Sequence, residues 1–257
     1  MKIGICIDWR NQEHILATAK AKADFVELGF SSFENATAEE IAALKDQLNS
    51  LSLPCLSYNL MFPWNMKVTG QTRDFVRIDE YLHAQMEKLQ VLGTRNVVFG
   101  SGGARALDGD NTRERAYDEM AELLALHVGP IFEKYGATCT IEALSDAAPL
   151  VTTTKDAITL AQMANHPQIK VLVDFYHVMR NGEPIDTILQ APHLLSHVHT
   201  ASQERFYPTL ADGTDYAAQF DVLRKAGYDG LVSIEGRSQG DFAPCVAEGI
   251  ATLTHFI

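Results

Sequence analysis

The amino-acid sequence repeats one pattern eight times: a short apolar run followed by a longer segment with helical periodicity. Successive runs start roughly 20 to 40 residues apart, the length of one strand–helix unit. Their continuous Val, Ile, Leu and Phe content is typical of parallel strands covered on both faces. The runs are Ile3–Trp9, Phe25–Phe30, Pro54–Leu60, Asn96–Ser101, Thr138–Leu144, Ile169–Phe175, Leu194–Thr200 and Leu231–Gly236.

Eight strand–helix units favour a closed (β/α)8 barrel over a doubly wound open sheet, which is the alternative if one strand is miscounted. The chain has 257 residues, and such a barrel needs about 250. The segments between the apolar runs carry signals for the start of a helix. Thr37-x-x-Glu40 predicts a capping box. Asn111 or Thr112 can cap a long helix, and Asp215 can start another. We predict one domain over residues 1–257.

Composition excludes several classes of protein. The formal net charge is −12, with 33 acidic and 21 basic residues and no basic run, so we expect no nucleic-acid partner. No apolar stretch approaches the 18 or more residues that a membrane span needs, and the start lacks a signal-peptide pattern. The four cysteines show no C-x-x-C spacing, and those in strand-like runs, Cys6 among them, are interpreted as small buried hydrophobes. We expect a cytoplasmic protein with no membrane partner.

Four consecutive predicted strands carry a metal-ligand residue where they end. These residues are Glu142 in TCTIEAL, Asp174 in VLVDFYH, His199 in SHVHTA and Glu235 in LVSIEGR. The carboxyl ends of the strands are where (β/α)8 barrels gather their chemistry. An isolated charge in an apolar run is costly, and three carboxylates in one barrel mouth repel one another. A divalent cation removes both penalties.

We therefore predict one bound divalent metal ion. Three carboxylates and one imidazole suit Mn²⁺, the expected ion, with Mg²⁺, Co²⁺ and Zn²⁺ as alternatives. Each of these residues, taken alone, is also explained by a salt bridge or a helix cap. His197 lies two positions before His199 and points to the same side of a strand. It is therefore an alternative ligand, or otherwise a hydrogen-bonded core histidine.

With these residues in place, the chain resembles the xylose isomerase-like TIM barrels of the sugar phosphate isomerase/epimerase superfamily. That group includes ketose 3-epimerases, hydroxypyruvate isomerases and inosose dehydratases. The resemblance covers essentially the whole chain and is strongest in VDFYHVMRNGEP, HVHTASQERFYPTLADGTDYAAQFDVLRKAGYDG and VSIEGR. It implies the same four metal ligands, with Glu142 and Glu235 also exchanging protons with the substrate on opposite faces. It further implies that His177 and Arg205 contact the substrate.

One stretch departs from the family pattern. Many members follow the glutamate of strand five with an Asn-Arg pair and then an acid that binds sugar hydroxyls. Here the stretch reads EALSDAAPLVTTT, with Ala148 where that acid is expected. We expect the metal site to survive this change, but the resemblance does not name the sugar.

The chemistry of the residues themselves supports these roles. Removing a proton next to a carbonyl produces an enediolate, whose negative charge a metal can hold, and a metal-adjacent glutamate can act as the base. Arg205 offers a fork of donors for a substrate oxygen, carboxylate or phosphate; alternatively it pairs at the surface with Glu204 or Asp212. His177 alternatively caps the helix that follows it.

Other residues near predicted strand ends are candidates for substrate binding. Glu27 ends the second run and Asn59 the third, so both are predicted to touch substrate hydroxyls; the alternative for Glu27 is a buried pair with a lysine or arginine. The loop MFPWNM presents Phe62 and Trp64 near the barrel mouth, either to a sugar or to a second subunit of a homo-oligomer.

The glycine-rich stretch FGSGGAR, residues 99–105, follows the fourth predicted strand. Its amides can form a phosphate cradle assisted by Arg105, or the stretch is a flexible active-site loop. It matches neither the Walker pattern nor G-x-G-x-x-G.

The leading hypothesis is a divalent-metal-dependent isomerase or epimerase of a small keto-sugar, sugar phosphate or hydroxy-keto acid, acting through an enediolate. A dehydratase or other lyase is the alternative, because the same enediolate can eliminate a β-hydroxyl group. A non-catalytic metal-binding subunit is a further alternative. An endonuclease IV-like repair enzyme is disfavoured by the charge of −12 and the lack of additional His and Glu ligands.

Overall fold

The computed structural model describes residues 1–93, 95–107, 109–145 and 150–257. Its strands are β1 Lys2–Ile7, β2 Phe25–Gly29, β3 Cys55–Asn59, β4 Asn96–Phe99, β5 Thr138–Glu142, β6 Ile169–Asp174, β7 Leu195–Thr200 and β8 Leu231–Ile234. Its α-helices are α1 Gln12–Lys20, α2 Ala38–Ser50, α3 Phe75–Leu89, α4 Arg113–Leu123, α5 Gly129–Lys134, α6 Thr154–Ala164, α7 Phe175–Asn181, α8 Tyr216–Lys225 and α9 Phe242–Thr254. A π-helical stretch, Leu124–Val128, joins α4 to α5.

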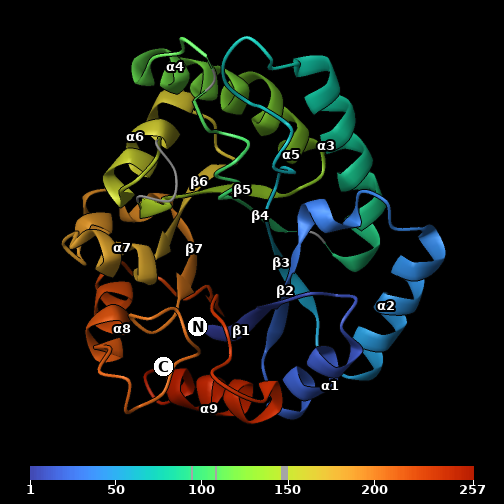
Figure 1. Cartoon of the computed structure of the whole chain (residues 1–257), viewed down its shortest axis with the longest axis vertical. Coiled ribbons are helices and arrows are strands. Elements are labelled where there is room, and N and C mark those ends of the chain that lie inside the picture. The colour runs from blue at the N-terminus through green and yellow to red at the C-terminus, as the bar shows by residue number, and fades with distance from the viewer. Residues whose placement is uncertain (94, 108, 146–149) are drawn as a thin grey trace.

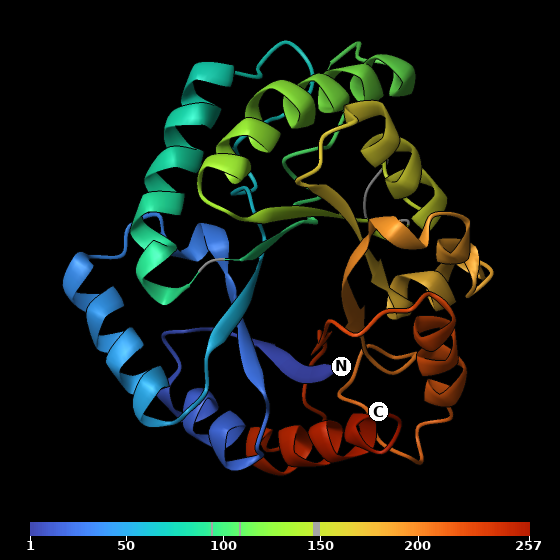
Figure 2. The ribbon, with the colours of Figure 1, turned by 180° about the vertical axis from the view of Figure 1, so that it is seen from behind.

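The strands form a closed parallel barrel in the order β1 to β8, with β1 paired to β8. The helices surround the strands in both ribbon views (Figures 1 and 2). The prediction of a (β/α)8 barrel is therefore confirmed, and the open sheet is excluded. The two ends of the helical ring meet where α1 contacts α9, and the ring of His14 stacks on Phe242 at 3.7 Å.

Side-chain caps start the helices where the sequence predicts them. Thr37 and Glu40 form the capping box of α2, and Thr112 rather than Asn111 caps α4. Asp215 caps α8 by accepting a hydrogen bond from the backbone N–H of Ala218. In the described part of the chain, no helix has the length and apolar character that crossing a bilayer requires.

Two one-residue register shifts align polar side chains inside the barrel. The shift between β2 and β3 brings Ser57 beside Glu27. The shift between β6 and β7 brings His199 beside Asp174. Because successive strand residues face opposite sides, a one-residue shift decides which side chains share a face. These shifts therefore determine which polar groups meet in the barrel interior.

Candidate active site

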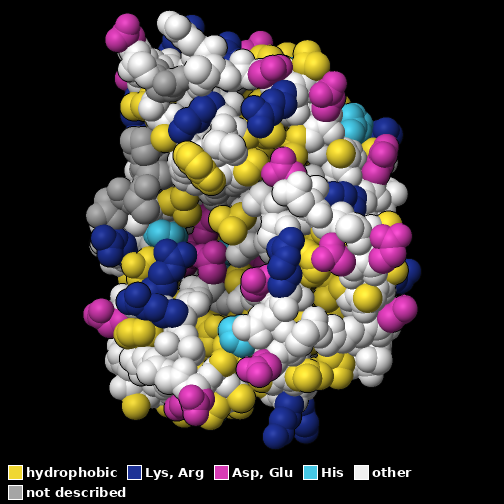
Figure 3. All heavy atoms as spheres, turned by 45° about the vertical axis from the view of Figure 1, so that its right-hand side comes forward, with side chains coloured by type: hydrophobic (Ala, Val, Ile, Leu, Met, Phe, Trp, Pro, Cys, Tyr) yellow, Lys and Arg dark blue, Asp and Glu magenta, His cyan; other side chains and the backbone are white. Residues whose placement is uncertain are grey.

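The structure brings together the four residues predicted as metal ligands. One ligand atom from each of Glu142, Asp174, His199 and Glu235 lies within 4.8 Å of every other. His199 Nδ1 is 3.3 Å from Glu142 Oε1 and 3.6 Å from Glu235 Oε2. Three of the residues lie within β5, β6 and β7, and Glu235 follows β8 directly, one residue beyond its end. Figure 3 shows a hollow in the surface with acidic side chains inside it and histidine and basic side chains beside it.

Several polar atoms of this cluster are buried and lack a hydrogen-bond partner. Among the described residues these include Glu142 Oε1, Asp174 Oδ2 and His199 Nδ1. Leaving such atoms unpaired costs about 1–3 kcal/mol each. All three can offer a lone pair once they are deprotonated, and they lie close together with a Glu235 oxygen. The donor set therefore fits a divalent cation of the Mn²⁺ or Mg²⁺ type.

The carboxylates of the cluster have opposite electrostatic environments. Burial and the charge of Glu235 raise the pKa of Glu142, and the same two causes raise the pKa of Asp174 to about 6. Burial also opposes ionisation of Glu235, but the charges of His199 and Arg205 outweigh it and lower its pKa to about 2. Without a cation, the cluster thus holds one well-ionised carboxylate and two that bind protons more readily.

The β4–β5 side of the site is shaped by Gly100 and Arg105. A Cβ atom at Gly100 would lie 2.0 Å from Glu142 Oε2, so only glycine leaves room for this carboxylate. Arg105 is completely buried. It donates hydrogen bonds to the backbone carbonyls of Phe99 (3.1 Å) and Glu142 (2.7 Å). The suggestion that Arg105 assists a phosphate cradle is therefore wrong, because its guanidinium holds the ends of β4 and β5.

Arg205 is held over the site by Glu235 and Tyr176. Its Nη2 donates a hydrogen bond to Glu235 Oε2 at 2.7 Å, and its guanidinium carbon lies 4.8 Å from the centre of the Tyr176 ring. The backbone of Arg205 adopts a left-handed φ of 60°. Its carbonyl accepts a hydrogen bond from the N–H of Arg237. The alternative of a surface pair with Glu204 or Asp212 is wrong.

His177 and Asn59 also lie at the cluster. His177 is buried in the first turn of α7, with Nδ1 2.9 Å from Ser145 Oγ and Nε2 3.6 Å from Asp174 Oδ2. It does not cap the helix; Asp174 does, by accepting from the N–H of Tyr176. Asn59 ends β3 as predicted, and its Nδ2 lies 3.4 Å from Glu235 Oε1.

Glu27 does not occupy the position expected for it. It lies in the middle of β2 rather than at its end, and its side chain is completely buried. Its partners are histidines, with Oε1 2.9 Å from His199 Nε2 and Oε2 2.6 Å from His197 Nε2. Contact with a substrate hydroxyl and pairing with a lysine or arginine are both contradicted by this arrangement. His197 is a buried, hydrogen-bonded histidine, whereas His199 lies in the ligand cluster.

The two aromatic residues predicted near the barrel mouth, Phe62 and Trp64, lie in the loop after β3 and differ in exposure. Phe62 is buried and packs on Tyr81 and Phe99, so its predicted exposure is wrong. Trp64 is 79% exposed, and its Cα and Cβ atoms lie close against Gly103. Ala148, the departure from the family pattern, lies outside the described residues.

A cavity of about 330 Å³ adjoins the cluster at the ends of β1, β2 and β3. It is lined by Cys6, Ile7, Asp8, Arg10, Gly29, Ser32, Asn59 and Leu60. Asn59 reaches from this cavity to Glu235. Cys6 was interpreted as a small buried hydrophobe. It is partly buried, but it also lines this cavity. The lining includes carboxylate, amide, guanidinium and hydroxyl groups, which suit a polyhydroxylated ligand.

Residues 15–254 match the family described as xylose isomerase-like TIM barrel. The chain belongs to this family. A curated relative, 3-dehydro-D-guloside 4-epimerase of Escherichia coli (strain K12), is 26% identical over 94% of this chain and 94% of its own length. The similar solved structures include a D-psicose 3-epimerase in the presence of D-fructose, at 15% identity and a TM-score of 0.85, covering 99% of this chain and 98% of that one. An apo 3-keto-D-glucoside 4-epimerase from E. coli has 20% identity and a TM-score of 0.83 over 99% of both chains. At these levels of identity, the similar structures show that the fold is shared.

Proposed function

We propose that this family member is a divalent-metal-dependent epimerase of a keto-sugar, acting through an enediolate. The observation that carries the proposal is the convergence of four buried side chains with unpaired lone-pair atoms at one barrel mouth. The full-length similarity to a 3-dehydro-D-guloside 4-epimerase supports the choice of epimerisation. That relative's name puts the inverted carbon next to a ketone, the bond pattern that an enediolate requires.

In this proposal Glu142, Asp174, His199 and Glu235 hold the ion, with Mn²⁺ preferred and Mg²⁺, Co²⁺ and Zn²⁺ as alternatives. A divalent ion bound there polarises the substrate carbonyl and offsets the charge that develops on its oxygen. Glu142 and Glu235 exchange the proton on the neighbouring carbon, one removing it and the other returning it to the opposite face.

Other residues orient the sugar. Arg205 and His177 contact oxygens at the reacting end, since both face the ligand cluster. Asn59 binds a hydroxyl where the cluster meets the cavity, and the cavity holds the remainder of the sugar. Trp64 is the exposed aromatic residue available either to stack on the sugar or to contact a second copy of the chain.

The direct experiment incubates the Mn²⁺-loaded protein with a panel of free ketoses and 3-keto-glycosides and follows the products by NMR. We expect a new epimer with one of these classes, and at least a thousandfold less product from Glu142→Gln. Unchanged activity of this folded variant contradicts the assignment of Glu142. A product that has lost water identifies the lyase outcome instead. Elemental analysis of the purified protein tests the identity of the ion.

A further inference from the structure

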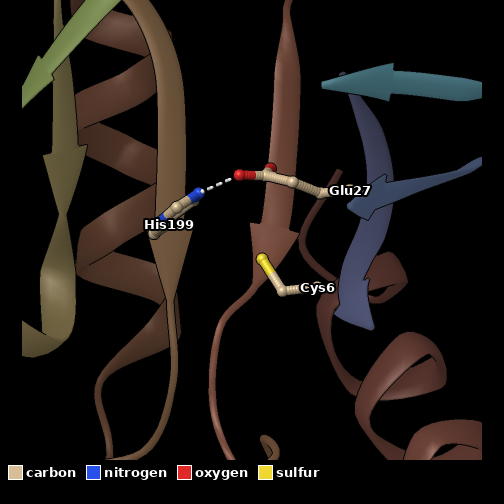
Figure 4. Close-up of side chains that lie close together, drawn as sticks. All are labelled: Cys6, Glu27 and His199. Carbon is tan, nitrogen blue, oxygen red and sulfur yellow. Dashed lines mark hydrogen bonds and ion pairs between the residues drawn. The ribbon is translucent and has the colours of Figure 1, made fainter. Parts of the chain in front are cut away.

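A buried hydrogen-bond network lies directly beneath the ligand cluster and is centred on Glu27. Figure 4 shows Glu27 and His199 pointing toward each other across the barrel interior, with Cys6 nearby. Glu27 Oε1 accepts from His199 Nε2 at 2.9 Å. Glu27 Oε2 accepts from His197 Nε2 and from Ser233 Oγ, both at 2.6 Å. Neither carboxylate oxygen remains open to a substrate.

This network defines which nitrogen of His199 faces the cluster. A carboxylate surrounded by donors acts as acceptor, so the Nε2 atom of His199 carries a hydrogen. To bind a cation, His199 must be neutral, and its lone pair is then on Nδ1, the atom beside Glu142 and Glu235. The same bond fixes the plane of the ring. We propose that Glu27 is a positioning residue, which orients His199 so that Nδ1 is its metal-binding atom; this rests on the proposed metal site.

The backbone supports this arrangement independently. The register shift between β2 and β3 brings Ser57 beside Glu27, and Ser57 Oγ lies 3.3 Å from His197 Nε2. Asn96 in turn donates to Ser57 Oγ at 2.8 Å. The shift between β6 and β7 pairs Leu172 with His197 and Asp174 with His199, and so determines which side of the sheet both histidines face. Carboxylate–histidine–metal chains of this kind orient ligands, and losing the outer partner costs about 10- to 100-fold in metal affinity.

A second metal held by Cys6, Glu27 and His199 is the competing explanation, since one ligand atom from each lies within 4.8 Å of the others. Binding there would have to displace the hydrogen from His199 Nε2 and break its bond to Glu27. That carboxylate already accepts three hydrogen bonds. The geometry therefore favours positioning over ligation.

The test combines NMR of ¹⁵N-histidine-labelled protein with Mn²⁺ titration. In wild type loaded with diamagnetic Mg²⁺ we expect His199 to carry its hydrogen on Nε2 alone, and we expect the Mn²⁺ titration to give one ion per chain. Glu27→Gln offers one acceptor oxygen to the two histidines, so we expect a changed hydrogen position on His199 or His197 and metal affinity lower by about 10- to 100-fold. Ser57→Ala removes the contacts with His197 and Asn96 but no hydrogen bond to Glu27 or His199, and we expect less than about a threefold loss.

The outcomes separate the two proposals. Wild type that binds no divalent metal contradicts the proposed function. Wild type that binds metal while Glu27→Gln binds it equally tightly contradicts only the positioning role. A hydrogen on Nδ1 rather than on Nε2 of His199 in the Mg²⁺-loaded wild type also overturns it, whether or not the variant folds. Two ions per chain, falling to one in Cys6→Ser, would show Glu27 to be a ligand instead.

Discussion

Arg205 Nη2 lies 2.7 Å from Glu235 Oε2, so the loop after β7 is joined to the chain segment after β8 at the centre of the site. The pairing keeps Glu235 ionised, because the positive charges of His199 and Arg205 lower its pKa to about 2 despite burial. The same arginine lies on the ring of Tyr176. A residue that the sequence offered for substrate binding therefore also fixes one of the two proposed proton-transfer groups.

Replacing Arg205 with lysine should lower kcat/KM by roughly 10- to 100-fold, because lysine keeps the charge but loses the planar fork and the stacking. Steady-state kinetics on the identified substrate measures the effect. Arg237→Lys is the matched control: Arg237 is exposed and stacks on Phe206 instead. Equal kinetics for Arg205→Lys and wild type would contradict the role of the fork.

Gly100→Ala should weaken metal binding by at least about tenfold. The added Cβ would lie 2.0 Å from Glu142 Oε2, so the carboxylate has to move. Gly240→Ala is the control, since a Cβ there meets nothing within 4 Å. Calorimetric titration with Mn²⁺ gives the comparison, and similar affinities for the two variants would show that Glu142 is not confined in this way.

Metal affinity should fall with decreasing pH, and more steeply below about 6. Burial opposes protonation of His199, but the charges of Glu27 and Glu235 outweigh it and raise its pKa well above its ordinary value, so His199 must lose a proton before Nδ1 can bind a cation. The metal-free protein has an Asp174 pKa raised to about 6 by burial and by the charge of Glu235. Below that pH the carboxyl group is protonated, and the cation must displace the proton, so affinity falls about tenfold per pH unit for each displaced proton. Mn²⁺ titrations at several pH values between 5 and 8 measure the slope. A slope that does not steepen below about pH 6 would contradict ligation by Asp174.

Glu119 should stabilise the fold at neutral pH and lose this effect in acid. Its buried carboxylate accepts from the backbone of Gly70 (2.7 Å), from Asn111 (2.9 Å) and from Arg115 (3.0 Å). Burial opposes ionisation, but these hydrogen bonds and the charge of Arg73 lower its pKa. A lowered folded pKa gives stability above the unfolded value that disappears as the pH falls through the folded value.

The corresponding variant is Glu119→Gln. We expect it to lower the free energy of unfolding by about 1.5–3 kcal/mol at pH 7. The difference from wild type should shrink below about pH 4, where the carboxyl group becomes protonated in the unfolded chain. Urea unfolding at pH 7 and at acidic pH measures both. Exposed Glu122 on the same helix provides the control, Glu122→Gln, and a difference that stays constant with pH would contradict the account.

The sequence predicted the barrel and the four clustered side chains because both follow from short-range patterns. Each candidate ligand lies within one residue of the end of an apolar strand, and strand ends of a closed parallel barrel meet at one mouth. The surroundings of Glu27 were not predictable in this way. They depend on one-residue register shifts in β3 and β7, and a shift changes which side chains are neighbours without leaving a signal in the apolar pattern.

Long-range packing explains the remaining misses. Arg105 was one candidate for binding a phosphate because it lies in a glycine-rich stretch, but its guanidinium donates to strand-end carbonyls of β4 and β5. Phe62 and Trp64 share one loop and one residue class, yet only Trp64 is exposed. The glycine of FGSGGAR that matters most, Gly100, owes its role to Glu142, 42 positions away in the chain. Such pairings require the tertiary structure.

Metal-dependent proton exchange beside a ketone can be tested by incubating the protein with its keto-sugar in D₂O. Mass spectrometry and NMR of the product then show whether deuterium has been incorporated. We predict an epimer carrying one added deuterium at the inverted carbon. We also predict that the exchange stops when the metal is removed, returns when Mn²⁺ is restored, and is absent from Glu142→Gln and Glu235→Gln. An epimer formed without deuterium in the metal-loaded enzyme, or at full rate in the metal-free protein, would contradict metal-dependent proton exchange.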